Sequence, residues 1–406
     1  MKIKTTLLAL AIITFLSACN KSTSDAPYLE EDTTSTASSE YLMDNFSEQP
    51  LDLTNYSMDT VFATDDQPYF IWHQVAKSEH GYYYFKSQML MFYDVNTKQE
   101  VPVCNKADCN HDRLNTDCNA NFMGSSEMFP KDTISTNRIL YYDGNLYMVG
   151  YDEESYTCLY KIASDGSTRE RYMRLYRSDM YTSDGDTMNM SWSTPDVCIH
   201  HGYVYYIYNK ESEKKIRRMK LGSEKAEIVF ASSGVRPTLY RMQAYGDYLF
   251  FQCANFTDET YEKAYGGIYA YNIQTKETHL VKKDAISTYL IQGDTLYYEY
   301  NGNTEFHSLH LKTQEEQLLL DDIKNAFSMS VDAHYIYKFT EDGLLFVYDH
   351  KGNSVYTVNR AIQECHFGDG NYLIGEDFDF ENQIAFTCIL KVSDFANGQA
   401  EWTIFP

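Results

Sequence analysis

Positive charge is scarce in this sequence. The chain of 406 residues carries 34 lysines and arginines against 58 aspartates and glutamates, a formal net charge of −24 at pH 7. Nucleic-acid binding needs basic residues to neutralise phosphates, and electrostatic attachment to an anionic lipid surface needs a basic patch. The composition therefore argues against nucleic acid as a partner and against membrane attachment through surface charge. It is typical of a solvated acidic exterior, which would also tolerate cations and basic partners.

Long apolar runs are equally scarce. The clearest one, residues 7–16, carries no charge and follows Lys2 and Lys4. A membrane-spanning helix needs about 20 apolar residues, so this run is too short to be one. A short positive start followed by a brief apolar run is typical of an export signal.

The end of this segment carries a more specific pattern. Residues 16–19 read LSAC, which resembles the bacterial lipobox, where cleavage precedes a cysteine that carries the lipid. Two or more acyl chains hold a protein stably on a membrane, because each buried methylene contributes about 0.8 kcal/mol. We therefore expect a signal peptide at 1–18 and a lipid on Cys19 that anchors the mature protein to the cell membrane, facing the outside of the cytoplasm. An ordinary secretory signal that ends near a cysteine is the alternative.

The segment after Cys19 lacks any sustained apolar period. Residues 19–64 are rich in Ser, Thr, Asp and Glu, as in EEDTTSTASSE. Such a composition buries too little apolar surface to offset the entropy lost on ordering. We expect a flexible spacer here, followed by the folded domain at 65–406.

Helical periodicity is missing as well, since no stretch keeps an amphipathic helix pattern over three turns. Tyrosine is abundant instead, with 37 residues, and aromatic residues favour strands. A small turn residue followed by an aromatic-rich strand recurs seven times, and a second alternating hairpin, clearest at 90–103, 267–281 and 344–358, follows each copy. The central positions are Tyr83, Leu146, Val204, Leu249, Leu296, Ile336 and Tyr372, at intervals of 63, 58, 45, 47, 40 and 36 residues.

Seven copies of a two-hairpin unit at roughly 40-residue spacing predict an all-β fold, a β-propeller of seven blades with four antiparallel strands each. The long first and second intervals leave room for insertions. The strand expected at 68–76 precedes the first copy and is a candidate for the strand that closes the ring against the last blade. Two stacked β-sandwiches, or a propeller of six or eight blades, are the alternatives.

The repeats resemble those of known bacterial propellers. The pattern DGNLYY…LYRYD…T, seen here at 143–147 and 268–275, is similar to the family named for the low-density-lipoprotein-receptor-related propeller, and more distantly to the periplasmic Tol-type propellers. The resemblance spans about 68–405. The cysteine-rich stretch at 101–122 looks like an insert of clostridial-type propeller lipoproteins of unknown function. This resemblance implies the fold and an extracytoplasmic address, but no activity.

Cysteines cluster in that insert, at 104–122. The stretch VPVCNKADCNHDRLNTDCNANF places Cys104, Cys109, His111 and Cys118 in a Cys-x4-Cys-x-His-x6-Cys pattern. Three thiolates and one imidazole make a closed tetrahedral zinc set, with no open position for a substrate water. We therefore expect one structural zinc. A disulfide, such as Cys104–Cys109 or Cys109–Cys118, is the alternative that an extracytoplasmic address favours, and free thiols without a role are the third.

Enzyme signatures are absent. The sequence contains no His-Glu-x-x-His, no Gly-x-Ser-x-Gly and no Gly-x4-Gly-Lys. Two acidic stretches, 183–187 and 375–382, do not fit a calcium-binding loop and are interpreted as acidic hairpin tips. We therefore expect a non-enzymatic binding or interaction module for a protein, peptide or glycan ligand on a propeller face. The alternative is a propeller enzyme that acts on extracellular polysaccharide through two carboxylates.

Overall fold

Seven antiparallel sheets make up the described part of the chain. The computed structural model describes residues 47–53, 75–86, 89–112, 117–122, 132–134, 138–152, 154, 156–177, 196–210, 213–233, 235–256, 264–283, 286–300, 304–368, 370–379, 381 and 384–405. All of them belong to one unit, Ala37–Pro406. The predicted signal peptide, the lipidated Cys19 and most of the predicted spacer lie outside these residues.

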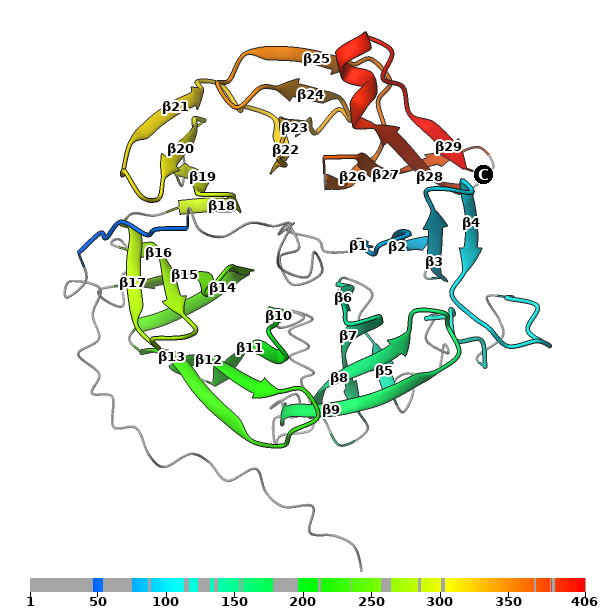
Figure 1. The fold of residues 1–406 in the computed structure, drawn as a ribbon, viewed down its shortest axis with the longest axis horizontal. Helices are drawn as coiled ribbons and strands as arrows, with labels where there is room; N and C mark the ends of the chain where they lie inside the picture. The colour runs from blue at the N-terminus through cyan, green and yellow to red at the C-terminus, as the bar shows by residue number, and fades with distance from the viewer. Residues whose placement is uncertain are drawn as a thin grey trace, which may run out of the picture. The chain divides into compact units, whose positions relative to one another are not determined.

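The first three blades follow one another along the chain (Figure 1). Blade 1 contains β1 (Val75–Lys77), β2 (Gly81–Lys86), β3 (Met89–Asp94) and β4 (Gln99–Pro102). Blade 2 contains β5 (Asp132–Ile134), β6 (Leu140–Tyr142), β7 (Asn145–Asp152), β8 (Tyr156–Ala163) and β9 (Arg169–Arg177). Blade 3 contains β10 (Val197–His200), β11 (Tyr203–Lys210), β12 (Glu213–Lys220) and β13 (Ala226–Ser233). In blade 2, β5 and β6 both pair with β7 and together take the place of one inner strand.

The other four blades repeat the same up-and-down order. Blade 4 contains β14 (Val235–Tyr245), β15 (Tyr248–Phe256), β16 (Ala264–Asn272) and β17 (Thr278–Lys283). Blade 5 contains β18 (Ile286–Gln292), β19 (Thr295–Tyr300), β20 (Phe306–His310) and β21 (Glu316–Leu320). Blade 6 contains β22 (Ala326–Val331), β23 (Ile336–Thr340), β24 (Leu345–Tyr348) and β25 (Ser354–Val358). Blade 7 contains β26 (Glu364–Gly368), β27 (Tyr372–Asp379), β28 (Ile384–Lys391), the 3-10 helix η2 (Val392–Asn397) and β29 (Thr403–Phe405).

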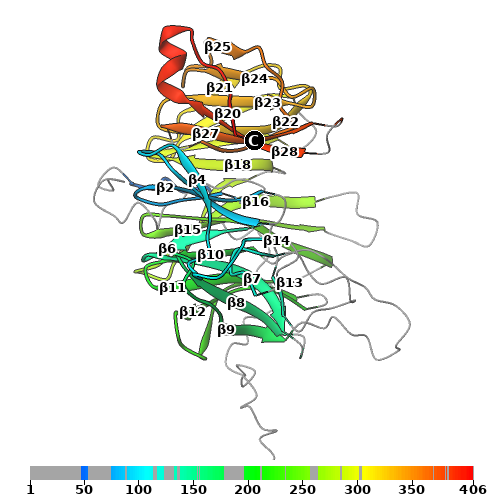
Figure 2. The same ribbon diagram turned by 90° about the vertical axis from the view of Figure 1, so that its right-hand side faces the viewer.

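The predicted seven-bladed propeller is confirmed. Each predicted repeat centre, from Tyr83 to Tyr372, lies on the second strand of its blade. The turn residue of the repeat closes the hairpin between the first two strands. In blades 2 and 3 this turn has two left-handed residues, Asp143-Gly144 and His201-Gly202, with φ between 46° and 77°, as a two-residue hairpin requires. In the side view most strands run in a similar direction, as expected for sheets stacked around a ring (Figure 2).

The core lies between neighbouring blades, which pack their aromatic and aliphatic faces together. At the seam between blades 1 and 7, Val75, Tyr82 and Tyr84 pack with Ile374 and Ile389 in one buried cluster. This apolar contact closes the ring, because every strand of blade 7 comes from the C-terminal part of the chain.

The prediction that a strand at 68–76 closes the ring against the last blade is wrong for residues 75 and 76, which the structure describes. Val75 and Ala76 belong to β1, which pairs with β2 inside blade 1 rather than with blade 7. Residues 68–74 lie outside the described residues. Blade 7 has no vacant edge for an N-terminal strand, since β29 already completes its four strands.

A short N-terminal segment, 47–53, packs on blades 4 and 5, although we expected it to belong to the flexible spacer. Its backbone donates from Gln49 N to the Leu280 carbonyl and from Leu51 N to the Leu311 carbonyl, both at 2.9 Å. Leu51 and Leu53 are buried in the cluster shared by the two blades. These seven residues therefore belong to the folded domain.

Candidate metal centre

The cysteine-rich loop follows β4 and is fixed at both ends to the same residue of β3. Val103 N donates to the Leu90 carbonyl at 2.9 Å, and Leu90 N donates to the Ala120 carbonyl at 2.8 Å. Leu90 and Ala120 are fully buried. The loop is thus held against blade 1, and Cys104, Cys109 and Cys118 pack on the apolar cluster that blade 1 shares with blade 7.

The turn between β8 and β9 holds the loop from the blade 2 side. The Gly166 carbonyl accepts from Asn119 Nδ2 at 2.8 Å and from Asn105 N at 3.3 Å. Arg169 Nη1 donates to the Asn121 carbonyl at 2.7 Å. Gly166 has φ +71°, and a Cβ there would lie 2.4 Å from the Val103 carbonyl carbon. Only glycine permits this close approach, so the loop joins blades 1 and 2.

The structure brings the four predicted ligands together. The ligand atoms of Cys104, Cys109, His111 and Cys118 all lie within 4.8 Å of one another. Cys118 is buried, and the other three side chains are half-buried. Cys118 Sγ lies 3.8 Å from His111 Nδ1, close to the edge of about 3.7 Å expected between ligands of a tetrahedral zinc with bonds of 2.0–2.3 Å. The donor set and its spacing therefore fit one four-coordinate metal ion.

The pKa values of the Cys104 and Cys118 thiols are shifted in opposite directions. Burial raises the pKa of the Cys104 thiol, but hydrogen bonds from the backbone N–H groups of Lys106 and Asn119 outweigh it, so the net pKa is lowered. Burial raises the pKa of Cys118 to about 11, and the nearby Cys109 and Cys104 add to this effect. A bound cation would favour the thiolate form of both groups. Cys104 and Cys118 are free thiols in this structure.

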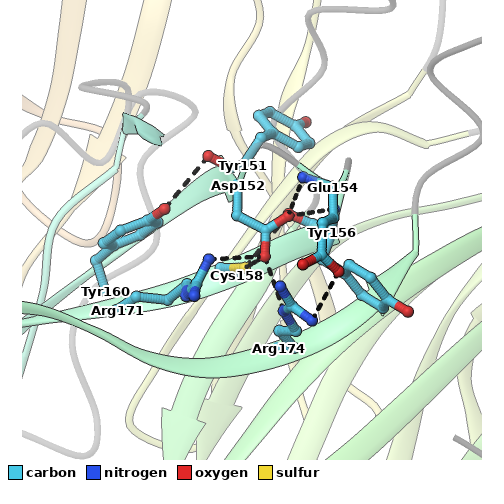
Figure 3. Close-up of polar contacts among 8 residues, drawn as sticks. All are labelled: Tyr151, Asp152, Glu154, Tyr156, Cys158, Tyr160, Arg171 and Arg174. Atoms are coloured by element: carbon cyan, nitrogen blue, oxygen red, sulfur yellow. Dashed lines mark hydrogen bonds and ion pairs between the residues drawn. The ribbon is translucent and has the colours of Figure 1, made fainter. Parts of the chain in front are cut away.

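A second polar cluster lies in blade 2, around Asp152 at the end of β7 (Figure 3). Its carboxylate is fully buried and accepts hydrogen bonds from both sides of the sheet. The donors are Arg171 Nη1 at 3.0 Å, Arg174 Nε at 2.8 Å and the backbone N–H groups of Glu154 and Tyr156 at 3.0 and 2.9 Å. With its lone pairs occupied in this way, Asp152 ties β7 to β9 and has little capacity left for a ligand.

The thiol next to this carboxylate is not activated. Cys158 Sγ lies 3.6 Å from Asp152 Oδ2. Burial, together with the negative charge of Asp152, raises the pKa of Cys158 to about 12. A thiol without thiolate character is a weak nucleophile, so this cluster is a structural one.

Sequence reasoning missed a carboxyl pair in blade 7. Glu364 on β26 and Glu376 on β27 are direct cross-strand partners. Burial, together with the negative charge of Glu364, raises the pKa of Glu376 to about 7. The positive charge of Lys86 from blade 1 opposes this shift. The acidic stretch 375–382 was interpreted as a hairpin tip, but its residues 375–379 belong to β27. No spacing rule could have found this pair, because the register of the two strands creates it.

Comparison with known proteins supports the fold and no narrower assignment. No family model and no curated protein matches the chain. A solved prolyl endopeptidase is similar over 84% of this chain, with 12% identity and a TM-score of 0.53, and this chain spans 50% of its length. At this identity the likeness shows the propeller fold alone.

Two bacterial propellers are also similar. BamB from Moraxella catarrhalis matches 79% of this chain and 85% of its own, with 12% identity and a TM-score of 0.41. TolB from Acinetobacter baumannii matches 68% of this chain and 59% of its own, with 12% identity and a TM-score of 0.38. Within the described residues, no helix has the length and apolar character that crossing a membrane requires.

Proposed function

We propose that the protein is a lipid-anchored, extracytoplasmic β-propeller that binds a ligand or partner protein without chemical conversion, and that one zinc ion fixes the fold of its cysteine-rich loop. The observation that carries this proposal is the closed ligand set of Cys104, Cys109, His111 and Cys118 in a loop that is itself bonded to blade 2 through Asn119. Four protein ligands complete a tetrahedral zinc and leave no position for a catalytic water. The metal then stabilises the scaffold, and binding takes place elsewhere on the ring.

The anchor rests on the lipobox-like LSAC at 16–19. From Cys19 to Glu48, the first residue bridged to blade 4, the chain can extend to roughly 100 Å at about 3.4 Å per residue. The propeller would thus reach well beyond the lipid surface while it stays attached to it. A protein tethered in this way meets large ligands or partners that do not enter the cell.

Membrane fractionation tests the anchor. The full-length protein should appear in the membrane fraction and incorporate an alkyne-labelled fatty acid. The Cys19→Ala variant should lose the label and leave the membrane after processing. A wild-type protein that is secreted without a label would contradict the lipid on Cys19.

A second candidate function rests on the carboxyl pair of blade 7. Hydrolysis of a glycosidic bond uses one protonated and one ionised carboxyl, and the pKa of about 7 at Glu376 favours such a mixed state in neutral solution. The two functions differ in one measurement on extracellular polysaccharides. A binding module retains the polymer and releases no new reducing ends. Release of reducing ends by the wild type, lost in Glu376→Gln and kept in the exposed control Glu341→Gln, would establish the enzyme instead.

A further inference from the structure

Three charged residues occupy corresponding sequence positions in or just before the inner strands of blades 2, 3 and 4. The residues paired with the repeat centres on these strands are Tyr141, Ile199 and Ala244. In each blade a charged residue lies three positions earlier in the chain: Arg138, Asp196 and Arg241. Two arginines and one aspartate therefore lie at the same offset from the repeat centre in three successive blades.

Asp196 connects its two neighbours. Its Oδ1 accepts a hydrogen bond from Arg138 Nη1 at 2.7 Å, and its Oδ2 accepts one from the backbone N–H of Arg241. On the other side of Arg241, the hydroxyl of Tyr289 from β18 donates to the Arg241 carbonyl. This network ties together the inner strands of blades 2, 3, 4 and 5.

These two contacts hold Arg241 in an uncommon backbone conformation. Its φ is +57°, within a register shift of β14 between Tyr240 and Gln243. A left-handed conformation costs a residue with a Cβ roughly 1–2 kcal/mol. Such strain persists where the surroundings fix it, and bulges of this kind redirect a side chain. Side chains from blades 3 and 5 thus fix where the Arg241 guanidinium lies.

The guanidinium itself stays outside this ion-pair network. Asp196 uses its oxygens on Arg138 and on the backbone of Arg241, not on the Arg241 side chain. Within the described part of the chain, Arg241 Nη1 is enclosed and has no hydrogen-bond partner. Burial raises the pKa of the nearby Glu299, whose carboxylate accepts a hydrogen bond from Ser287 Oγ at 3.0 Å, and the charge of Arg241 opposes this shift. The guanidinium carbon of Arg241 lies over the Tyr240 ring, 5.7 Å from its centroid.

We propose that Arg241 is an anion-binding residue, which holds a carboxylate or phosphate group of the ligand at the inner ends of blades 4 and 5. The inference rests on the proposed binding function and names the ligand class. A guanidinium presents a planar fork of N–H donors that matches both groups. An anion there would satisfy a donor that the described residues leave unsatisfied, and it would gain from a fork already held in place.

Titration of the purified full-length protein with small probes tests this site. Succinate reports on a carboxylate, inorganic phosphate reports on a phosphate, and succinamide is the neutral control, all at constant ionic strength. We expect calorimetry to detect binding of at least one of the two anions and none of succinamide. The Arg241→Asn variant should bind at least tenfold more weakly with an unchanged unfolding temperature, because asparagine tolerates a positive φ. Arg241→Gly is the second variant, since glycine adopts this conformation without strain.

The matched control is Arg360→Asn, which removes an exposed arginine between blades 6 and 7 and should leave the affinity unchanged. Binding of succinate alone or of phosphate alone supports the site and selects the ligand group. No binding of either anion, or equal affinity in the wild type and both Arg241 variants, overturns the inference. The proposed binding function is tested separately, by measuring whether the protein retains polysaccharide or a partner protein. If the wild type retains such a ligand and the Arg241→Asn variant retains it equally well, only the anion site is contradicted.

Discussion

The side-chain amide of Asn119 donates to the carbonyl of Gly166 at 2.8 Å, and this contact joins the cysteine-rich loop of blade 1 to a turn of blade 2. The loop approaches the turn so closely that Gly166 has no room for a side chain. The loop that carries the four candidate metal ligands is thus held by two blades at once. Changes in the turn should therefore affect the metal site, although no turn residue is itself a ligand.

Gly166→Ala should destabilise the protein and weaken metal binding. A Cβ would meet backbone atoms of Val103 and Cys104 at 2.4–2.5 Å. We expect an unfolding free energy lower by about 3 kcal/mol or more, from backbone strain plus overpacking. Gly144→Ala is the control, because Gly144 has a similar φ of +72° and nothing within 4 Å of the new Cβ. Denaturant unfolding should show a clearly larger loss for Gly166→Ala, and equal losses would contradict the close-approach account.

Asp152→Asn should destabilise blade 2 strongly. The buried carboxylate accepts hydrogen bonds from Arg171 and Arg174, whose side chains are 40% and 26% exposed, and loss of a hydrogen bond between charged groups costs about 1.5–3 kcal/mol. Glu154→Gln is the control. It removes a contact with Arg174 in which the Glu154 side chain is 58% exposed, and exposed pairs contribute about 0–1 kcal/mol. A loss at Asp152 as small as that at Glu154 would show that the cluster does not hold β7 and β9 together.

Glu376 should make the stability fall as the pH rises from about 4.5 to about 7. Burial raises its pKa in the folded protein to about 7, while its ordinary value is 4.5. Between these values the folded state still holds a proton that the unfolded chain has released, so raising the pH favours unfolding. Below and above this window Glu376 adds no further pH dependence.

Thermal unfolding at pH 5 and pH 8 checks the Glu376 prediction. The wild type should lose more stability between the two values than Glu376→Gln, which cannot ionise. The exposed Glu341→Gln should keep the wild-type difference. An unchanged difference in Glu376→Gln would mean that another group sets the pH dependence.

Leu51→Ala should reveal that the segment 47–53 contributes to the stability of the ring. Leu51 is buried at 3% exposure between blades 4 and 5, and truncation of a buried leucine costs about 2–5 kcal/mol. Leu318→Ala provides the control, since Leu318 is 46% exposed. If both variants unfold at the wild-type denaturant concentration, the segment does not hold the blades.

The fold could be predicted from the sequence because each blade repeats the same local signals. An aromatic-rich strand after a turn residue reports directly on the second strand of each blade, as at Val204 and Leu249. The clustering of Cys104, Cys109, His111 and Cys118 was also predictable, since they lie in one loop and their spacing is visible in the chain.

Contacts that depend on register or on tertiary packing could not be predicted in the same way. The Glu364–Glu376 pair arises from two strands of one blade, and the Asp196–Arg241 contact joins two blades. The packing of Leu51 depends on a surface formed by blades 4 and 5 together. A polar composition around 19–64 predicts a spacer on average, yet two buried leucines suffice to bring 47–53 into the domain.

The zinc content of protein purified without chelators tests the central claim most directly. The account predicts one zinc per chain in the wild type, lost together with several degrees of unfolding temperature in Cys104→Ser, because Cys104, Cys109, His111 and Cys118 form one ligand set. Cys365→Ser, at a half-buried cysteine outside the cluster, should keep the metal. A wild type without metal, with fewer free thiols than the eight cysteines other than Cys19, would contradict the zinc site and favour a disulfide in the loop.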